Sequence, residues 1–229
     1  MLEKRKRISK KEMKEDSLVT TYYKAYNFFV ENQMRLYIGI GAIALIVVAI
    51  VLFSNKRAND NQTAAGLLSK VIPSYEAGKY KEAIDGQKTP TIMGLKEIVD
   101  KYGSTEQGEN AKIYLANSLY NTGQYEAALD LYEDYSGSNK LFKATALAGQ
   151  AACFEVKKDF SKSADLYKEA ANISQSDPSN AEYLVKAGID LMKLNKNDEA
   201  KKMFETVKKD YRTTSAAQDV DKYLVQIES

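Results

Sequence analysis

An uninterrupted apolar run constrains this chain more than any other feature of its sequence. The 18 residues from Leu36 to Phe53 read LYIGIGAIALIVVAIVLF and include no charged side chain. As an α-helix the run would be about 27 Å long, close to the thickness of the hydrocarbon core of a bilayer. It starts too late and is too long for a cleaved signal peptide. A buried helix of a soluble core is the alternative, but such cores rarely hold apolar runs of this length. The sequence therefore predicts a single transmembrane helix over 36–53.

The charges on either side of the run predict its orientation. Residues 1–35 carry nine Lys or Arg and five acids, whereas residues 54–229 carry 24 bases and 26 acids. Most of the N-terminal bases lie within 1–15, which we interpret as a cytoplasmic tail, because short basic segments stay on that side. The segments directly next to the apolar run slightly favour the opposite orientation, because residues 16–35 carry two bases and residues 54–73 carry three. We expect the N-terminus inside and the bulk of the chain outside.

Two helical faces near the run could meet a partner. Leu18, Tyr22, Tyr26 and Phe29 recur at helical spacing, which predicts an amphipathic juxtamembrane helix over 16–35. This helix either lies flat on lipid or docks on a membrane protein. Within the run, three small residues and an isoleucine recur every three or four positions, which predicts contact with another membrane helix. They are Gly39, Ala42, Ile46 and Ala49.

The remainder of the chain contains an internal repeat. Three segments align on their turns: NTGQYEAALDLYEDY, EVKKDFSKSADLYKEAA and KLNKNDEAKKMFETV. Each has a small residue after the turn, Ala128, Ser163 or Ala200, and an aromatic residue four positions later. The small residues are 35 and 37 positions apart. This pattern resembles the tetratricopeptide repeat, a unit of two antiparallel helices that must stack on its neighbours to bury its apolar face.

The resemblance implies an all-α fold. We expect a single N-terminal transmembrane helix followed by a tetratricopeptide-like α-solenoid of helical hairpins with a C-terminal capping helix. The domain is placed at 54–229, with hairpins at about 64–103, 105–137, 143–175 and 180–212 and the capping helix at 215–228. The first hairpin diverges most: it has about eleven extra residues near 86–94, and Pro73 predicts that its first helix is kinked or starts late.

Serines mark three of the expected helix starts. Ser104, Ser179 and Ser215 are each followed three positions later by Gln or Glu. In such a capping box the hydroxyl accepts a hydrogen bond from a free amide of the first helical turn. The sequence therefore predicts that these three serines are N-caps.

The composition excludes most catalytic and metal chemistry. The chain has no His, and its single Cys, Cys153, allows neither an internal disulfide nor a CxxC site. The charged residues are scattered along helices, no glycine-rich phosphate loop is present, and a net charge of +2 gives no reason to expect a nucleic-acid partner. We predict that the chain is not an enzyme, with no catalytic site, metal, cofactor, small-molecule substrate or nucleic-acid partner.

Binding through the repeats remains, because stacked hairpins of this family line a concave groove with their first helices. The family's groove positions carry over to Ile113, Asn117, Tyr120, Asn121, Ala148, Gly149, Ala152, Val185, Lys186, Ile189 and Met192. The Lys, Asn and Arg set with which one subclass clamps a C-terminal carboxylate is absent. A small, apolar groove suits an apolar peptide or a partner helix. Alternatively, these residues pack against a neighbouring helix, such as the C-terminal one.

A closer resemblance covers nearly the whole chain. The order of basic tail, FFVENQMRLYIG segment, single span and repeats, together with GLKEIVDKYGST at 94–105, is similar to the YfgM-like family of bacterial inner-membrane proteins. The resemblance implies an ancillary subunit of the Sec translocon, with a cytoplasmic N-terminus and a periplasmic repeat domain. It also implies partners: the lipid bilayer, the Sec translocon or another inner-membrane complex, and translocated polypeptides or chaperones.

Two other functions stay open at this point. The chain could be a structural scaffold of another envelope or secretion complex. It could also be a docking receptor that faces the cytoplasm, if its orientation in the membrane is reversed.

Overall fold

The computed structural model describes the backbone of residues 10–175 and 177–228, with side chains from residue 19 onward. The chain divides into two compact units, residues 1–56 and residues 57–229. Residues 1–9 of the predicted basic tail lie outside the described residues, and residues 10–15 belong to the first helix.

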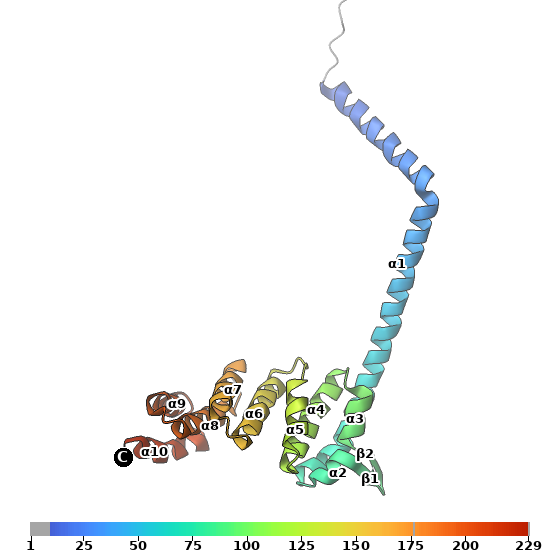
Figure 1. The fold of residues 1–229 in the computed structure, drawn as a ribbon. Helices are drawn as coiled ribbons and strands as arrows, with labels where there is room; N and C mark the ends of the chain where they lie inside the picture. The colour runs from blue at the N-terminus through green and yellow to red at the C-terminus, as the bar shows by residue number, and fades with distance from the viewer. Residues whose placement is uncertain (1–9, 176, 229) are drawn as a thin grey trace, which may run out of the picture. The chain divides into compact units, whose positions relative to one another are not determined.

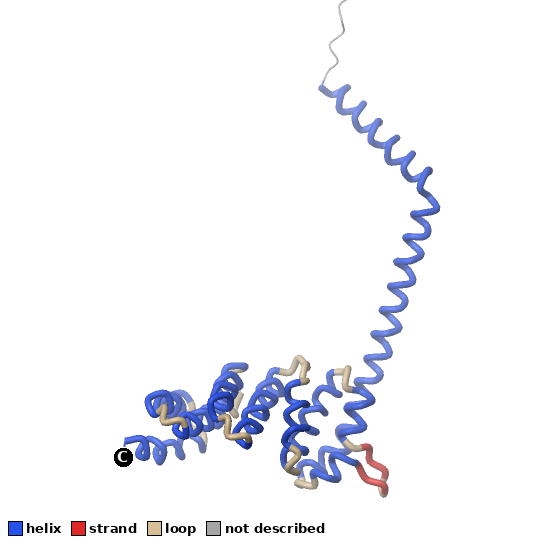
Figure 2. The backbone as a smooth tube through the Cα atoms, in the orientation of Figure 1, coloured by secondary structure: helices blue, strands red, loops and turns tan. Residues whose placement is uncertain are grey.

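The first unit is built from a single helix, α1 (Lys10–Glu76), whose last part belongs to the second unit. This helix passes through the aromatic segment and the apolar run without interruption (Figure 2). Its most apolar window is 0 % buried, and it is the one helix among the described residues that is long and apolar enough to cross a membrane. The predicted late start near Pro73 is wrong, because α1 contains Pro73 and continues to Glu76. Near the end of a helix, proline removes only one backbone hydrogen bond.

The second unit is a chain of short helices (Figure 1). The end of α1 is followed by α2 (Tyr80–Asp85), strands β1 (Gly86–Lys88) and β2 (Thr91–Met93), and α3 (Leu95–Tyr102). The helices that follow pair as hairpins: α4 (Glu106–Asn121) with α5 (Tyr125–Glu133), α6 (Lys140–Val156) with α7 (Phe160–Ile173), and α8 (Asn180–Lys193) with α9 (Asn197–Asp210). The last helix is α10 (Ser215–Glu228), which packs on α9 and α8.

The turn inside each hairpin has the same backbone geometry. In the described part of the repeat domain, the second residue after the first helix has positive φ at Gly78 (71°), Gly123 (82°), Lys158 (61°) and Asn195 (57°). The next amide then donates to a carbonyl five residues earlier, as from Gln124 N to Leu119 O at 2.9 Å. This arrangement satisfies carbonyl groups that would otherwise be free at the helix end. The last three of these turns are 35 and 37 residues apart, the spacing of the sequence repeat.

A small sheet interrupts the helical pattern after α2. Strands β1 and β2 pair antiparallel, with Gly86 opposite Met93 and Lys88 opposite Thr91. This β-hairpin occupies the extra residues of the divergent first hairpin. The sequence did not predict it, because strands of three residues are too short to show an alternating pattern. With this addition, the predicted fold class is confirmed: a long N-terminal apolar helix is followed by helical hairpins and a C-terminal helix.

Small residues allow the two helices of a hairpin to approach closely. A Cβ atom on Gly188 of α8 would lie 2.4 Å from Cε1 of Phe204 of α9, so only glycine fits against that ring. The small residues of the sequence repeat, Ala128, Ser163 and Ala200, are all 0 % exposed, as close packing of paired helices requires.

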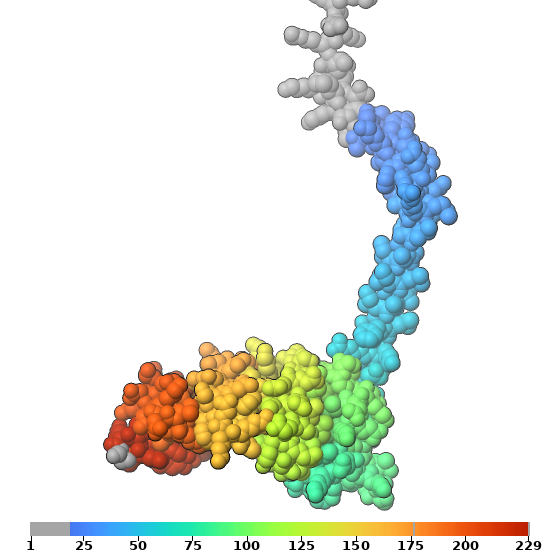
Figure 3. All heavy atoms as spheres, in the orientation of Figure 1, coloured from blue at the N-terminus to red at the C-terminus, as the bar shows by residue number. Residues whose placement is uncertain are grey.

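Each hairpin also packs on the next one. Helix α5 contacts α6, and α7 contacts α8, so the apolar face that one hairpin leaves open is covered by its neighbour. The space-filling view shows this as successive bands of colour from green to red along the repeat domain (Figure 3).

Two of the three predicted N-caps are displaced, and the third serine makes no capping bond. The cap of α4 is Thr105, whose Oγ1 accepts from Gly108 N at 3.0 Å, rather than Ser104. Before α10 the hydroxyl of Thr214, not that of Ser215, accepts from Ala217 N at 3.2 Å. Ser179 precedes α8 but its side chain makes no capping hydrogen bond. A Ser or Thr next to the predicted position offers the same hydroxyl, so local backbone geometry decides which one caps.

Candidate protein-binding surface

The eleven predicted groove residues lie on the first helices of three hairpins, α4, α6 and α8. The structure places two of them in the core: Ile113 is 1 % exposed and Val185 is 9 % exposed. Ile113 belongs to a buried cluster that includes residues of α1, α4 and α5. Val185 belongs to a second cluster that includes residues of α9 and α10. Both side chains serve the interior of the stack, and a ligand on the surface would not reach them.

Asn117 and Gly149 join neighbouring helices. The amide of Asn117 donates from Nδ2 to the Tyr75 hydroxyl at 3.1 Å and accepts from the Tyr132 hydroxyl at 2.6 Å. A Cβ atom on Gly149 would lie 2.3 Å from the ring of the same tyrosine, Tyr132. These two predicted groove residues therefore hold α1, α4, α5 and α6 together.

The C-terminal helix partly covers the predicted groove on α8. Ile189 and Met192 pack against the same buried cluster as Tyr223 and Leu224 of α10. A cleft of about 340 Å³ remains between α8 and α10, lined by Ile189, Met192 and Tyr223 among others. The sequence left open whether these residues bind a peptide or pack on the C-terminal helix; here they line a cleft together with that helix.

Besides Asn117, Gly149, Ile189 and Met192, five more predicted groove residues keep part of their surface accessible. They are Tyr120, Asn121, Ala148, Ala152 and Lys186. The ring of Tyr120 lies edge-on to that of Tyr125 at 5.2 Å, and the Lys186 ammonium lies 5.6 Å from the ring centre of Tyr167. Because α4 contacts α6 directly, Tyr120, Ala148 and Ala152 belong to adjacent helices of one surface.

A charged cluster at the junction of the last two hairpins was not predicted. Lys193 pairs with Asp190 at 2.8 Å and with Glu155 at 3.3 Å, and the Tyr167 hydroxyl donates to Glu155 at 2.8 Å. Burial raises the pKa of Asp190, and the lowering effect of Lys193 does not cancel it. The repeat spacing could have indicated two of these residues, because Glu155 occupies the register of Tyr120 and Lys193 that of Asn121.

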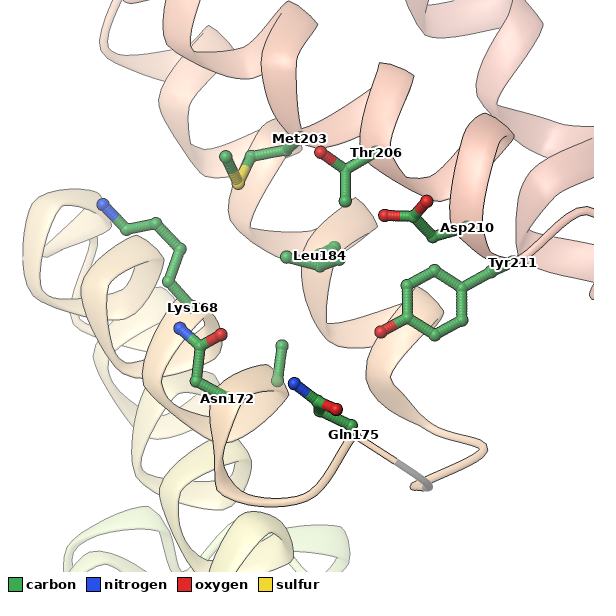
Figure 4. A pocket seen from close by; sticks show the side chains of 9 residues that line it. Lys168, Asn172, Gln175, Leu184, Met203, Thr206, Asp210 and Tyr211 are labelled. Atoms are coloured by element: carbon green, nitrogen blue, oxygen red, sulfur yellow. The ribbon is translucent and has the colours of Figure 1, made fainter.

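Two further clefts lie away from the predicted groove. One, of about 580 Å³, opens between α7 and α9, with Leu184 of α8 between their side chains (Figure 4). Lys168 and Asn172 border it from α7, and Met203 and Thr206 border it from α9. The other, of about 720 Å³, is lined by residues of α2, α3, α4 and α5. Neither cleft includes a predicted groove residue, since second helices supply much of their lining.

The four predicted membrane-contact residues are exposed on α1. Gly39, Ala42, Ile46 and Ala49 follow one another at spacings of three and four positions, so they share one side of the helix. No atom lies within 4 Å of the position that a Cβ on Gly39 would take.

The reactive groups of the repeat domain are held in unreactive surroundings. Burial raises the pKa of the Cys153 thiol to about 11, and its Sγ lies 3.5 Å from the Tyr125 carbonyl oxygen. Among the described residues, no group of three or more His, Cys, Asp or Glu is arranged to hold a metal ion. The surface can therefore offer shape, apolar contacts and charges to a partner.

Comparison with known proteins supports the repeat architecture. Residues 115–181 match the profile of the tetratricopeptide repeat family. No curated protein sequence matches the chain. The matched range runs from the middle of α4 to the start of α8, and the hairpin of α8 and α9 beyond it has the same turn. The chain therefore combines a candidate membrane span with a domain of tetratricopeptide-like hairpins, a type of repeat that serves protein–protein interaction.

Proposed function

We propose that this chain is a membrane-anchored adaptor that binds other proteins through its repeat domain. One observation carries the proposal: a fully exposed apolar helix, too apolar to remain in water, belongs to the same chain as a stack of tetratricopeptide-like hairpins. The helix supplies the anchor, and the stack supplies a surface that includes Tyr120, Ala148 and Ala152.

The finer proposal concerns the partner. We propose an ancillary subunit of the Sec translocon that lies in the bacterial inner membrane and passes translocated polypeptides to periplasmic chaperones. The similarity to the YfgM-like family supports this role, and the basic N-terminal tail supports an orientation with the repeat domain in the periplasm.

Protease treatment of spheroplasts tests the orientation. We expect external protease to digest residues 57–229 while a tag on the N-terminus stays protected. A repeat domain that is cleaved only after the cells are lysed would overturn the proposed topology and favour a docking receptor that faces the cytoplasm.

Site-specific photo-crosslinking tests the partners. Crosslinkers placed at Ala42 in the span and Ala152 in the repeat domain should capture translocon subunits and secreted chains, respectively. With the crosslinker kept at Ala152, the variant Ala148→Arg should lose the second set of products, because a long cation blocks the surface between α4 and α6. The matched control Ala77→Arg, at an exposed alanine beyond α1, should keep them. Products confined to cell-wall or secretion-machine proteins would instead indicate a scaffold.

A further inference from the structure

An aromatic face runs along α1 on the N-terminal side of the apolar run. Tyr22, Tyr26 and Phe29 are spaced by four and three positions, and the rings of Tyr22 and Tyr26 stack at 6.3 Å between centroids. Their exposed fractions are 66 %, 55 % and 61 %. Val19, Tyr23 and Val30 extend the same side of the helix, and all three are exposed. So much aromatic surface requires an apolar or interfacial environment.

The opposite face of this segment is polar. Lys24, Asn27, Glu31 and Arg35 are spaced by three, four and four positions, so they form a second stripe. One aromatic residue, Phe28, lies on this polar side, and the pattern does not explain it. A helix with one aromatic and one charged face suits the boundary between water and lipid.

The length of α1 restricts where the aromatic face can be. If the helix continued straight out of the bilayer from Leu36, Tyr22 would lie about 20 Å beyond the hydrocarbon edge. The headgroup region on each side is only about 5–8 Å thick. A straight helix would therefore hold Tyr22 and Tyr26 in water, whereas a helix that turns into the membrane plane keeps both rings in the headgroup region.

We propose that residues 19–35 of α1 form an interfacial helix whose aromatic face lies in the headgroup region of the same bilayer. The inference rests on the proposed membrane anchor and adds a second, peripheral contact with lipid. Gly39 and Gly41, at the start of the span, supply the local freedom for the required bend, and no neighbouring atom lies within 4 Å of either missing Cβ position.

Three observations favour lipid over a protein as the occupant. The face contains three tyrosines, whose rings are apolar and whose hydroxyls remain hydrated, and such residues concentrate at the membrane interface. Covalent continuity with the apolar run keeps the segment at the membrane surface. Lys24 and Arg35 are long cations on the opposite, polar face, and such side chains reach lipid phosphates at the membrane surface.

Fluorescence quenching by brominated lipid tests this proposal. The chain contains no Trp, so single Trp substitutions report one position each. The full-length protein would be reconstituted into phosphatidylcholine and phosphatidylglycerol vesicles whose acyl chains carry bromine near the headgroup, and, for the span reference Leu45→Trp, near the methyl end of the chain. We expect Tyr26→Trp and Phe29→Trp to be quenched at least about twofold more than the polar-face controls Asn27→Trp and Glu31→Trp.

Two reference variants separate this inference from the proposed anchor. Leu45→Trp, within the span, should be strongly quenched, and Tyr211→Trp, in the repeat domain, should not. If Leu45→Trp escapes quenching, the membrane anchor fails and the inference fails with it. If only Leu45→Trp is quenched, or if both faces of residues 19–35 are quenched equally, the anchor stands and the interfacial helix is overturned. A photo-crosslinker at Tyr26 that couples to one membrane protein in intact cells, rather than to lipid, would identify a protein as the occupant, which also overturns it.

Discussion

Single residues at the hairpin turns differ in how well they suit their backbone conformation. Gly123 has φ of 82°, which glycine adopts without strain, whereas Lys158 and Asn195 occupy the same position of later hairpins with φ of 61° and 57°. A side chain with a Cβ atom is disfavoured in this left-handed region, and asparagine tolerates it better than lysine does. Lys158 is therefore the least suited of the turn residues.

Replacing Lys158 by glycine should stabilise the repeat domain. The variant Lys158→Gly relieves the left-handed strain, of about 1–2 kcal/mol, at the cost of a more flexible unfolded chain, of about 0.5–1 kcal/mol. We expect a net gain of about 0.5–1 kcal/mol in the free energy of unfolding, measured by urea denaturation. The reciprocal variant Gly123→Ala should lose about 1 kcal/mol. If Lys158→Gly is instead destabilising, the contacts of the Lys158 side chain stabilise the folded state by more than the backbone strain at that position costs.

The thiol of Cys153 should be nearly inert at neutral pH. Burial raises its pKa to about 11, so less than about one part in a thousand is thiolate at pH 8, and only the thiolate reacts with disulfide reagents. Because the folded pKa lies above the ordinary value, the reaction rate should rise with pH up to about 11. A disulfide dye should label the native protein at least about 100-fold more slowly than the unfolded chain. Equal rates would mean that α5 and α6 separate readily.

At the scale of helices, a hairpin depends on one small residue facing one ring. In the last hairpin Gly188 faces Phe204, which is 0 % exposed and stacks on Tyr223 of α10 at 5.3 Å between centroids. Ala116 and Ala151 occupy the register of Gly188 in the earlier hairpins. The glycine lowers helix propensity by about 1 kcal/mol, so its presence inside α8 reflects the close approach of the two helices.

Two glycine-to-alanine substitutions should have opposite effects. In Gly188→Ala the new methyl group would lie 2.4 Å from the Phe204 ring, so we expect a loss of about 1–3 kcal/mol in the free energy of unfolding. In Gly66→Ala, within α1, no atom lies within 4 Å of the added carbon, so the better helix propensity should give a gain of about 0.5–1 kcal/mol. Thermal unfolding of both variants measures the difference. A gain in both would show that α8 and α9 can separate without cost.

At the scale of the whole repeat domain, each hairpin is stabilised by its neighbours. Within the described residues, α10 packs on α8 and α9 and covers the open side of the last hairpin. Val220 of α10 is 0 % exposed and packs in the cluster of α8 and α9, whereas Val225 on the same helix is 67 % exposed. In a stack of this kind, loss of the end helix destabilises the adjacent hairpin first.

A charge introduced on the face of α10 that packs on α8 and α9 should therefore destabilise the adjacent hairpin. A charge on the exposed face of α10 should have no such effect. Val220→Asp places a carboxylate in the core, and we expect α10 to detach and amide hydrogen exchange in α9 to accelerate by at least about tenfold. Exchange in α4 and α5 should change little. The matched control Val225→Asp should leave exchange unchanged across the domain. Uniform acceleration in Val220→Asp would show that the stack unfolds as one cooperative unit.

The sequence by itself determined the architecture of this protein. Local and periodic signals were sufficient: an uncharged run of 18 residues, small residues at intervals of 35 and 37, and aromatic residues four positions after each. These signals repeat, so an error in one hairpin does not remove the pattern. The β-hairpin at 86–93 escaped detection, because it occurs once and its strands are too short to be periodic.

Only the tertiary structure decided which residues are available to a partner. Ile113 and Val185 have the register of groove residues, yet neighbouring helices bury both. Asn117 is engaged by tyrosines 42 and 15 positions away, and Ile189 and Met192 share a cleft with Tyr223 of α10. The exposure of a residue depends on where helices from other parts of the chain pack. The spacing of residues along one helix carries no information about the positions of those other helices. The sequence thus specifies the repeat, whereas the stacking of the hairpins decides how much of its surface remains open.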